Sequence, residues 1–372
     1  MTEAWHSQTA SVRRGELRRR GISDSLRTPR WDDVEARDRV RQAFERHVYG
    51  RAPVARPDSF SVKASTVPSG KRDQNAVRLE IAYTGPGGSG GFEALLMTSA
   101  LTPVNAPTFL LISHRDERPD FIRQNDAEFW PVDQILARGY ATVLMHAQDV
   151  DPDEDDGFAN GVHGVFGRPD GDESWGTIAA WAWAAQRVLD ALEDRPEVDA
   201  RRVAVVGHSR GGKTALWAAA NDPRFAMAVS NNSGCSGAAL TRGGQGETIA
   251  QINDAFPHWF SGNYRRYSGD FSRLPIDQHQ LLALIAPRLI YVASAVGDTW
   301  ADPQSEFLAT LAAGEAWPNS LEDAIPWAHH VILNSPVHAP RVGYHLRSGG
   351  HGLMVVDWFN FLDFADLNLC VE

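Results

Sequence analysis

Apolar runs and helical periodicities alternate along the chain from residue 106 to its end. The apolar runs lack the polar alternation of half-exposed strands, which predicts strands buried on both faces. In chain order they are TFLLISH, ATVLMHAQD, RRVAVVGH, FAMAVSNN, RLIYVASA and VGYHLRS. The segments between and after them predict helices, namely FWPVDQILARGY, WGTIAAWAWAAQRVLDALED, KTALWAAAN, EFLATLAAGEAW and DWFNFLDFADLNL. This order predicts an α/β fold with a mostly parallel sheet and helices on both faces.

The amino-terminal part follows a different pattern. Residues 1–30 are charged and aperiodic, so we expect loosely ordered structure there. The apolar residues within 34–50 have helical spacing, which predicts a helix that ends at Gly50. Two strand-like runs follow, AVRLEIAYTG and FEALLMTSA, with the turn PGGSGG between them. We therefore predict a single domain over residues 31–372.

One long segment interrupts the alternation of strands and helices. Residues 238–286 are rich in glycine, arginine and aromatic residues and show no clear period. We interpret this segment as an insertion that roofs one end of the sheet, above the active site.

Charge and cysteine content narrow the class of partner. The formal net charge of −11 and the absence of a basic stripe argue against nucleic acid. Two cysteines, Cys235 and Cys370, cannot form a disulfide framework, and a reducing compartment fits at least as well as an oxidising one. The amino terminus has no apolar signal core, and no run approaches a membrane span. These features predict a cytoplasmic protein without a membrane partner, although a chain trimmed of its signal would look the same.

The stretch VVGHSRGGKTALW contains a Gly-x-Ser-x-Gly motif between a predicted strand and a predicted helix. This arrangement is typical of the nucleophile elbow of α/β-hydrolases, in which small flanking residues let the backbone turn sharply around the serine. It predicts Ser209 as a nucleophile lifted over the carboxyl edge of the sheet. A glycine-bounded turn with an idle serine is the alternative interpretation.

A serine nucleophile of this class needs an acid and then a histidine later in the chain. The loop after the last strand offers His351, which follows Ser348, Gly349 and Gly350, and we favour it as the base. His345 falls inside that strand and His279 precedes the penultimate strand, so both are expected to be structural.

Two carboxylates follow the penultimate strand, in the sequence VGDTWADP. Asp298 stands nearer the strand end and is the predicted triad acid. Asp302 precedes Pro303, and we expect it to cap the next helix.

The motif GHSRGGK resembles the Gly-Cys-Ser-Arg-x-Gly-Lys signature of glucuronoyl esterases, carbohydrate esterase family 15, with His208 in place of cysteine. The likeness extends over most of the chain and is densest in WGTIAAWAWA, SNNSGCSGAAL, GETIAQINDAFPHWF, LPIDQHQLLALIAPR, GDTWADP and RSGGH. It implies hydrolysis of an ester between glucuronic acid on xylan and an alcohol, on a small-molecule or oligosaccharide substrate. It also implies that no metal and no organic cofactor takes part.

The resemblance also assigns roles to individual residues. Arg210 would help to hold the oxyanion, and Lys213 would bond sugar hydroxyls. Glu247 and Trp300 would line the sugar pocket, because a sugar offers hydroxyls to a carboxylate and a face to an indole. Taken without the family, Lys213 could be a solvated residue of the first helical turn and Trp300 a core aromatic.

Two departures from the family pattern bear on these roles. Many members carry the triad acid as a glutamate in the motif that lands on SNNSG, where this chain has Asn232. The loop ISHRDERPDF also differs from the family's Asn- and Gly-rich loop. An esterase for acetylated sugars or other small esters, and a non-catalytic binding protein on a hydrolase scaffold, are therefore kept as alternatives.

Overall fold

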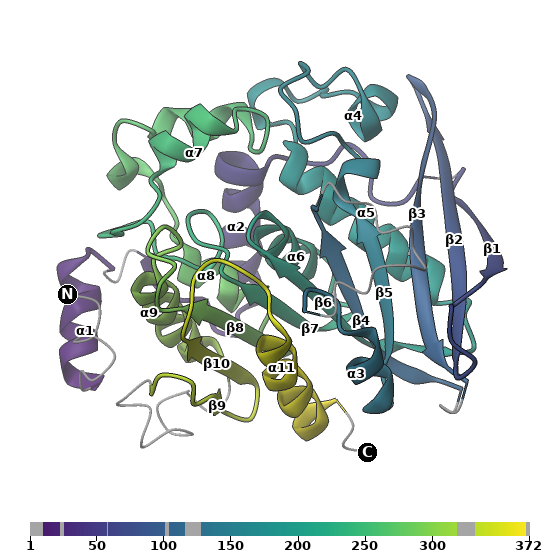
Figure 1. The fold of residues 1–372 in the computed structure, drawn as a ribbon. Helices are drawn as coiled ribbons and strands as arrows, with labels where there is room; N and C mark the ends of the chain where they lie inside the picture. The colour runs from purple at the N-terminus through teal and green to yellow at the C-terminus, as the bar shows by residue number, and fades with distance from the viewer. Residues whose placement is uncertain are drawn as a thin grey trace.

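The computed structural model describes residues 10–22, 26–57, 59–100, 104–115, 128–317 and 332–369. Within these ranges one mixed sheet runs through the molecule in the order β1-β2-β3-β5-β4-β6-β7-β8-β10-β9 (Figure 1). The strands are β1 (Ser61–Val67), β2 (Gln74–Gly85), β3 (Gly88–Ser99), β4 (Ala106–Ser113), β5 (Ala141–His146), β6 (Val198–His208), β7 (Phe225–Asn231), β8 (Leu289–Ala295), β9 (Val337–His338) and β10 (Val342–Arg347). The strands from β5 to β10 in this order pair in parallel, as the apolar runs predicted. The structure therefore has the α/β-hydrolase arrangement expected from the serine motif.

The α-helices are α1 (Ala10–Arg19), α2 (Val34–Phe44), α3 (Val132–Ala137), α4 (Gly161–Phe166), α5 (Thr177–Leu192), α6 (Arg210–Asn221), α7 (Ile249–Ala255), α8 (Gln278–Ala283), α9 (Pro303–Ala313) and α11 (Val355–Asn368). Shorter turns of helix are η2 (Glu45–Tyr49), η3 (Ala147–Asp149), η4 (Gly171–Glu173), η5 (Gly262–Tyr267), η6 (Phe271–Arg273) and η7 (Gly314–Ala316). Each helix predicted between or after the apolar strands is present.

Helices cover both faces of the sheet, which explains why its strands do not alternate in polarity. Successive side chains of a strand point to opposite faces. In β4, Leu110 and Ile112 pack in the cluster that contains α5, α6, α8 and α9, whereas Phe109 and Leu111 pack with α3 and α11. Both faces of the sheet are buried under helices, so the side chains on both faces are apolar.

In the amino-terminal segment the structure describes residues 10–22 and 26–30. Helix α1 lies within residues 1–30, which show no apolar period. Arg20 donates from Nη1 to Ser305 Oγ of α9 at 2.6 Å, and Leu26 is buried. The contacts that hold this segment come from distant parts of the chain, so the local pattern does not reveal them.

Strand β1 is a second element that the sequence analysis missed. It pairs with β2 and forms the edge of the sheet, and its side chains are mostly exposed. An exposed edge strand needs no apolar run, so hydrophobic patterning gives no signal for it.

The segment over residues 238–286 divides into two parts. Helix α7 lies beyond the carboxyl ends of the strands, on the same side of the molecule as α4 (Figure 1), and the turn η5 packs against it. Helix α8, in contrast, packs with α6 and α9 against the sheet. The part of the segment that covers the end of the sheet is therefore the part before α8, residues 238–277, which we call the roof segment.

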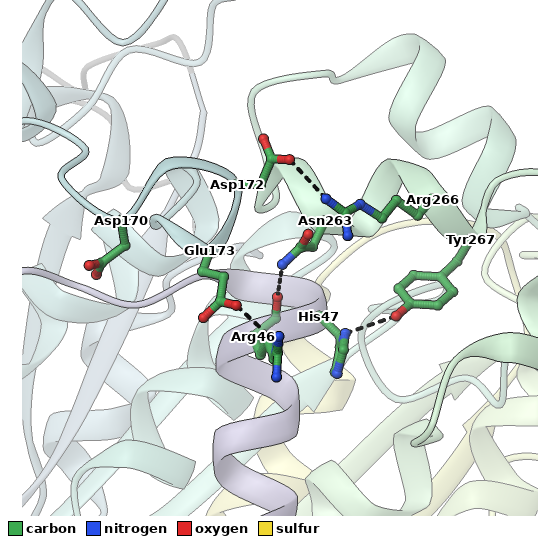
Figure 2. A pocket seen from close by; sticks show the side chains of 8 residues that line it. All are labelled: Arg46, His47, Asp170, Asp172, Glu173, Asn263, Arg266 and Tyr267. Carbon is green, nitrogen blue, oxygen red and sulfur yellow. Dashed lines mark hydrogen bonds and ion pairs between the residues drawn. The ribbon is translucent and has the colours of Figure 1, made fainter.

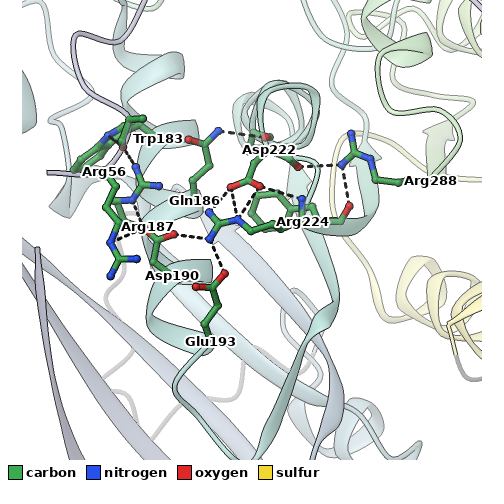
Figure 3. Close-up of polar contacts among 12 residues, drawn as sticks. Arg56, Trp183, Gln186, Arg187, Asp190, Glu193, Asp222, Arg224 and Arg288 are labelled. Carbon is green, nitrogen blue, oxygen red and sulfur yellow. Dashed lines mark hydrogen bonds and ion pairs between the residues drawn. The ribbon is translucent and has the colours of Figure 1, made fainter. Parts of the chain in front are cut away.

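A buried ionic network joins the amino ends of the strands (Figure 3). Asp190 of α5 accepts from Arg187 Nε at 2.6 Å and from Arg224 Nη1 at 2.7 Å. Arg288, before β8, donates to the carbonyls of Asp222 and Phe225 at 3.0 and 2.9 Å. These charges are paired with one another and with backbone carbonyls, so they have a structural role at the amino ends of β7 and β8. No helix in the described part of the chain is long and apolar enough to cross a membrane.

Candidate active site

Ser209 occupies a strained turn between β6 and α6. Its backbone adopts φ 56° and ψ −122°, a region that side-chain-bearing residues rarely enter. A Cβ on Gly207 would lie 1.9 Å from the carbonyl oxygen of Gly211, and a Cβ on Gly211 would lie 2.9 Å from that of Ile112. The two glycines of the motif are therefore required by backbone contact, as the elbow interpretation predicted.

The structure brings His351 and Asp298 together beside this turn. His351 lies in the loop after β10, and its Nδ1 is 2.6 Å from Asp298 Oδ2 in the loop after β8. The His351 side chain is 46% exposed, whereas that of Asp298 is 4% exposed. Nearly half of the His351 side chain is thus exposed, while its Nδ1 is held by a buried carboxylate.

His208 connects the histidine to the elbow. Its ring centroid lies 4.4 Å from that of His351, and it immediately precedes Ser209. Burial lowers the pKa of His208 to about 3, so this ring stays neutral. A neutral ring can pack against His351 without repelling an imidazolium there.

Asn232 supports the carboxylate rather than replacing it. Its Nδ2 donates to Asp298 Oδ2 at 2.7 Å, and its backbone has a positive φ of 46°. Burial raises the pKa of Asp298, but the hydrogen bonds from His351 and Asn232 outweigh this and hold the pKa below its ordinary value. Asp298 is therefore an ionised carboxylate with an amide donor beside it.

The other candidate histidines have structural partners. His345 lies within β10, where its Nε2 is 2.7 Å from Asp357 Oδ1. His279 is buried in α8, and its Nε2 is 2.7 Å from the carbonyl oxygen of Leu26. Both are held inside the protein, as expected.

Asp302 caps α9 as predicted, and it also holds the roof segment. Its side chain accepts from the Ser305 amide at 3.1 Å and from the Gln245 amide at 2.6 Å. The second contact, which the sequence did not reveal, fixes the chain that leads to Glu247.

Lys213 is buried in the first turn of α6. Its Nζ donates to the carbonyl oxygen of Ser233 at 2.5 Å, and only 4% of the residue is exposed. Burial lowers the pKa of Lys213, and the charge of Glu247 acts in the opposite direction. The alternative of a solvated lysine is wrong, because this ammonium is buried and interacts electrostatically with the Glu247 carboxylate.

Glu247 and Trp300 lie side by side. The Glu247 amide donates to the Trp300 carbonyl oxygen at 2.9 Å, which joins the roof segment to the loop after β8. The Trp300 residue is 55% exposed, so it is not a core aromatic. This backbone contact holds the two residues in neighbouring positions, and the exposed indole offers a flat apolar surface.

Arg210 follows the serine and points toward the roof. Its Nη1 forms an ion pair with Asp153, and its guanidinium carbon lies 4.8 Å from the Trp259 ring centroid and 5.2 Å from that of Phe256. Its Nε is buried and has no hydrogen-bond partner among the described residues. A buried cationic donor without a partner beside the nucleophile is suited to a developing negative charge.

Glu306 is a buried carboxyl that the sequence analysis did not identify. It lies in α9 and accepts from Ser294 Oγ at 2.6 Å and from the Gly234 amide at 2.9 Å. Burial raises the pKa of Glu306 to about 8, so the carboxyl is largely neutral at pH 7. Glu306 directly precedes the apolar run FLATLAA in α9, and this position was the sequence signal that could have marked it.

A separate polar cavity of about 400 Å³ lies between η2, η4 and η5 (Figure 2). Arg46 pairs with Glu173 at 3.0 Å, and Arg266 pairs with Asp172 at 3.0 Å. The cavity contains none of the triad residues, and each of its two arginines is paired with an acidic residue that also lines the cavity.

Across the described ranges no group of three His, Cys, Asp or Glu side chains is placed to hold a metal ion.

A serine on a strand-to-helix elbow, with a histidine and a carboxylate from later loops, defines a serine hydrolase of the α/β-hydrolase fold. The family model for fungal glucuronyl esterases matches residues 114–320. The chain is 35% identical to the carbohydrate esterase MZ0003 from an unknown prokaryotic organism, over 90% of this chain and 84% of that protein. It is 38% identical to a 4-O-methyl-glucuronoyl methylesterase of Hypocrea jecorina (strain QM6a), over 39% of this chain and 33% of that protein.

Solved structures agree with these matches. A glucuronoyl esterase from Solibacter usitatus has a TM-score of 0.79 and 34% identity, over 90% of this chain and 92% of that chain. The protein belongs to the glucuronoyl esterases, carbohydrate esterase family 15, and it is a carboxylic ester hydrolase.

The contacts of Asp298 predict which side chain supplies the triad charge. Asp298→Ala should lower turnover of an ester about a thousandfold or more, because the imidazolium loses its counter-charge. Asn232→Ala should cost about tenfold or less, since it removes a neutral donor. Asp302→Ala should act on stability, by about 1 kcal/mol. Steady-state kinetics and thermal unfolding of the three variants test this, and a larger kinetic loss for Asn232→Ala than for Asp298→Ala would contradict it.

Glu306 predicts a pH dependence of stability. The folded carboxyl keeps its proton up to about pH 8, whereas in the unfolded chain it ionises near 4.5. The free energy of unfolding should therefore fall between about pH 5 and pH 8, by up to about 1.4 kcal/mol per pH unit from this group. Glu306→Gln, which stays neutral, should remove that part of the slope in urea titrations across this range. An unchanged slope in the variant would show that the carboxyl is ionised throughout.

Proposed function

We propose that this protein hydrolyses esters of glucuronic acid, including the 4-O-methylated sugar, through an acyl-enzyme on Ser209. The observation that carries the proposal is the position of Lys213 in the first turn after the nucleophile, buried and within the field of Glu247. An ammonium and a carboxylate at this place can bond the hydroxyl groups of a sugar, which a simple acetate ester lacks. The names of the family relatives, which include glucuronoyl esterase, support the same substrate class.

The chemistry follows from the roles of the triad. His351 takes the proton from the Ser209 hydroxyl as the oxygen attacks the ester carbonyl, and Asp298 stabilises the imidazolium. His351 then gives the proton to the leaving alcohol, which leaves a glucuronoyl ester on Ser209. Water attacks this ester, with His351 as base, and releases the free acid and the serine.

The negative charge on the carbonyl oxygen meets donors at the start of α6. Backbone N–H groups at a helix amino terminus carry partial positive charge. The Nε of Arg210 adds a charged donor at the same end of the helix. We assign Arg210 to stabilisation of the oxyanion on this ground.

The sugar ring lies on the other side of the nucleophile, toward the loops after β7 and β8. Lys213 and Glu247 bond its hydroxyl groups, and Trp300 packs against its face. Because the indole is exposed, a glucuronic acid attached to a longer oligosaccharide can reach it without entering the core.

A substrate comparison tests this function. Lys213→Met keeps most of the length of the side chain and removes its charge. It should lower kcat/KM for benzyl glucuronate about ten- to a hundredfold, the value of a hydrogen bond to a charged group, and lower that for an aryl acetate much less. Only the sugar offers hydroxyl groups to the ammonium.

Ser209→Ala is the inactive control for both substrates, since loss of the nucleophile should reduce turnover by several orders of magnitude. Equal losses on the two esters in Lys213→Met would instead indicate a structural lysine and favour an esterase for acetylated or other small esters. Near wild-type turnover in Ser209→Ala would contradict the serine mechanism altogether.

A further inference from the structure

Asp153 is a nearly buried carboxylate that three segments of the chain share. One oxygen, Oδ2, forms the ion pair with Arg210 Nη1. The other, Oδ1, accepts from Trp259 Nε1 at 2.6 Å and lies 2.9 Å from His258 Nε2. Only 6% of the Asp153 side chain is exposed. The loop after η3, the start of α6 and the part of the roof segment between α7 and η5 therefore meet at this one group.

The ionisation of Asp153 follows from these contacts. Burial raises the pKa of Asp153, but the hydrogen bond from His258, the charge of Arg210 and the hydrogen bond from Trp259 together hold the pKa below its ordinary value. The group is a carboxylate at neutral pH, and every oxygen contact described above is with a donor.

Arg210 is consequently held in one orientation. Its guanidinium lies against the paired rings of Trp259 and Phe256, whose centroids are 3.7 Å apart. Asp153 engages Nη1, so rotation about the last bonds of the side chain is blocked. The buried Nε then remains as a fixed donor.

The roof segment has its own attachment, independent of Asp153. The Thr177 amide donates to the His258 carbonyl oxygen at 3.0 Å, and the Ile178 amide donates to that of Trp259 at 3.2 Å. Both donors belong to the first turn of α5. Removing the Asp153 charge therefore leaves the roof anchored by its backbone, and the local effect falls on Arg210.

We propose that Asp153 is a positioning residue for ester hydrolysis, which aims Arg210 at the carbonyl oxygen and couples the roof segment to the nucleophile elbow. The inference rests on the proposed oxyanion role of Arg210. An arginine free to rotate would have to be ordered in each transition state, and that ordering is unfavourable. Fixing it in advance stabilises the transition state more than the bound ester.

The test uses Asp153→Asn in the full chain, with Asp155→Asn as the matched control. Asp155 is exposed in the same loop, so its variant makes the same chemical change without touching Arg210. Asp153→Asn should lower kcat for benzyl glucuronate about 10- to 100-fold and leave KM within about threefold, because the interaction acts in the transition state. Asp155→Asn should match the wild type. The thermal midpoint of both variants separates a kinetic effect from unfolding.

A double-mutant cycle with Arg210→Ala shows whether Asp153 acts through the arginine. Once Arg210 is absent, Asp153→Asn should lower kcat by less than about threefold further. If the reductions in kcat from the two substitutions multiply in the double variant, the positioning role is wrong. A rise in KM with kcat unchanged in Asp153→Asn would also overturn it. If Arg210→Ala itself leaves kcat unchanged, the oxyanion assignment is wrong, whereas a large effect of Arg210→Ala with none from Asp153→Asn rejects only this inference.

Discussion

The backbone contact inside the elbow is the constraint on which the site depends. A Cβ on Gly207 would collide with the carbonyl oxygen of Gly211, a Cβ on Gly211 would collide with that of Ile112, and Ser209 between them adopts a positive φ. This geometry ends β6 and starts α6 within one residue. The nucleophile therefore stands at the carboxyl edge of the parallel sheet, where the loops after β8 and β10 bring Asp298 and His351 beside it.

Charge is distributed in this site so that each buried ion has a partner. Asn232 lies 2.7 Å from Asp298, and a second carboxylate at that distance would force one of the two to take up a proton. The amide instead donates to Asp298 and leaves its charge for His351. This arrangement explains physically why a neutral residue at position 232 suits a chain that supplies its triad carboxylate after β8.

Local sequence predicted most of the architecture and the order of the triad, because apolar runs, the glycine spacing and the Ser–Asp–His order are visible along the chain. It did not reveal the burial of Lys213, the carboxyl of Glu306, or the ion pair between Asp153 and Arg210. These depend on contacts between segments far apart in sequence. Strand β1 was not predicted because its side chains are mostly exposed, and an exposed edge strand carries no apolar pattern.

The central claim is that the strained serine forms the covalent intermediate in hydrolysis of a glucuronate ester. A fluorophosphonate, which reacts with activated serines, tests it when the labelled peptides are identified by mass spectrometry. The account predicts one label per chain, on Ser209, with loss of esterase activity in step with labelling and protection by free glucuronic acid. Labelling at another residue in step with inactivation, or full activity in a chain labelled at Ser209, would contradict it.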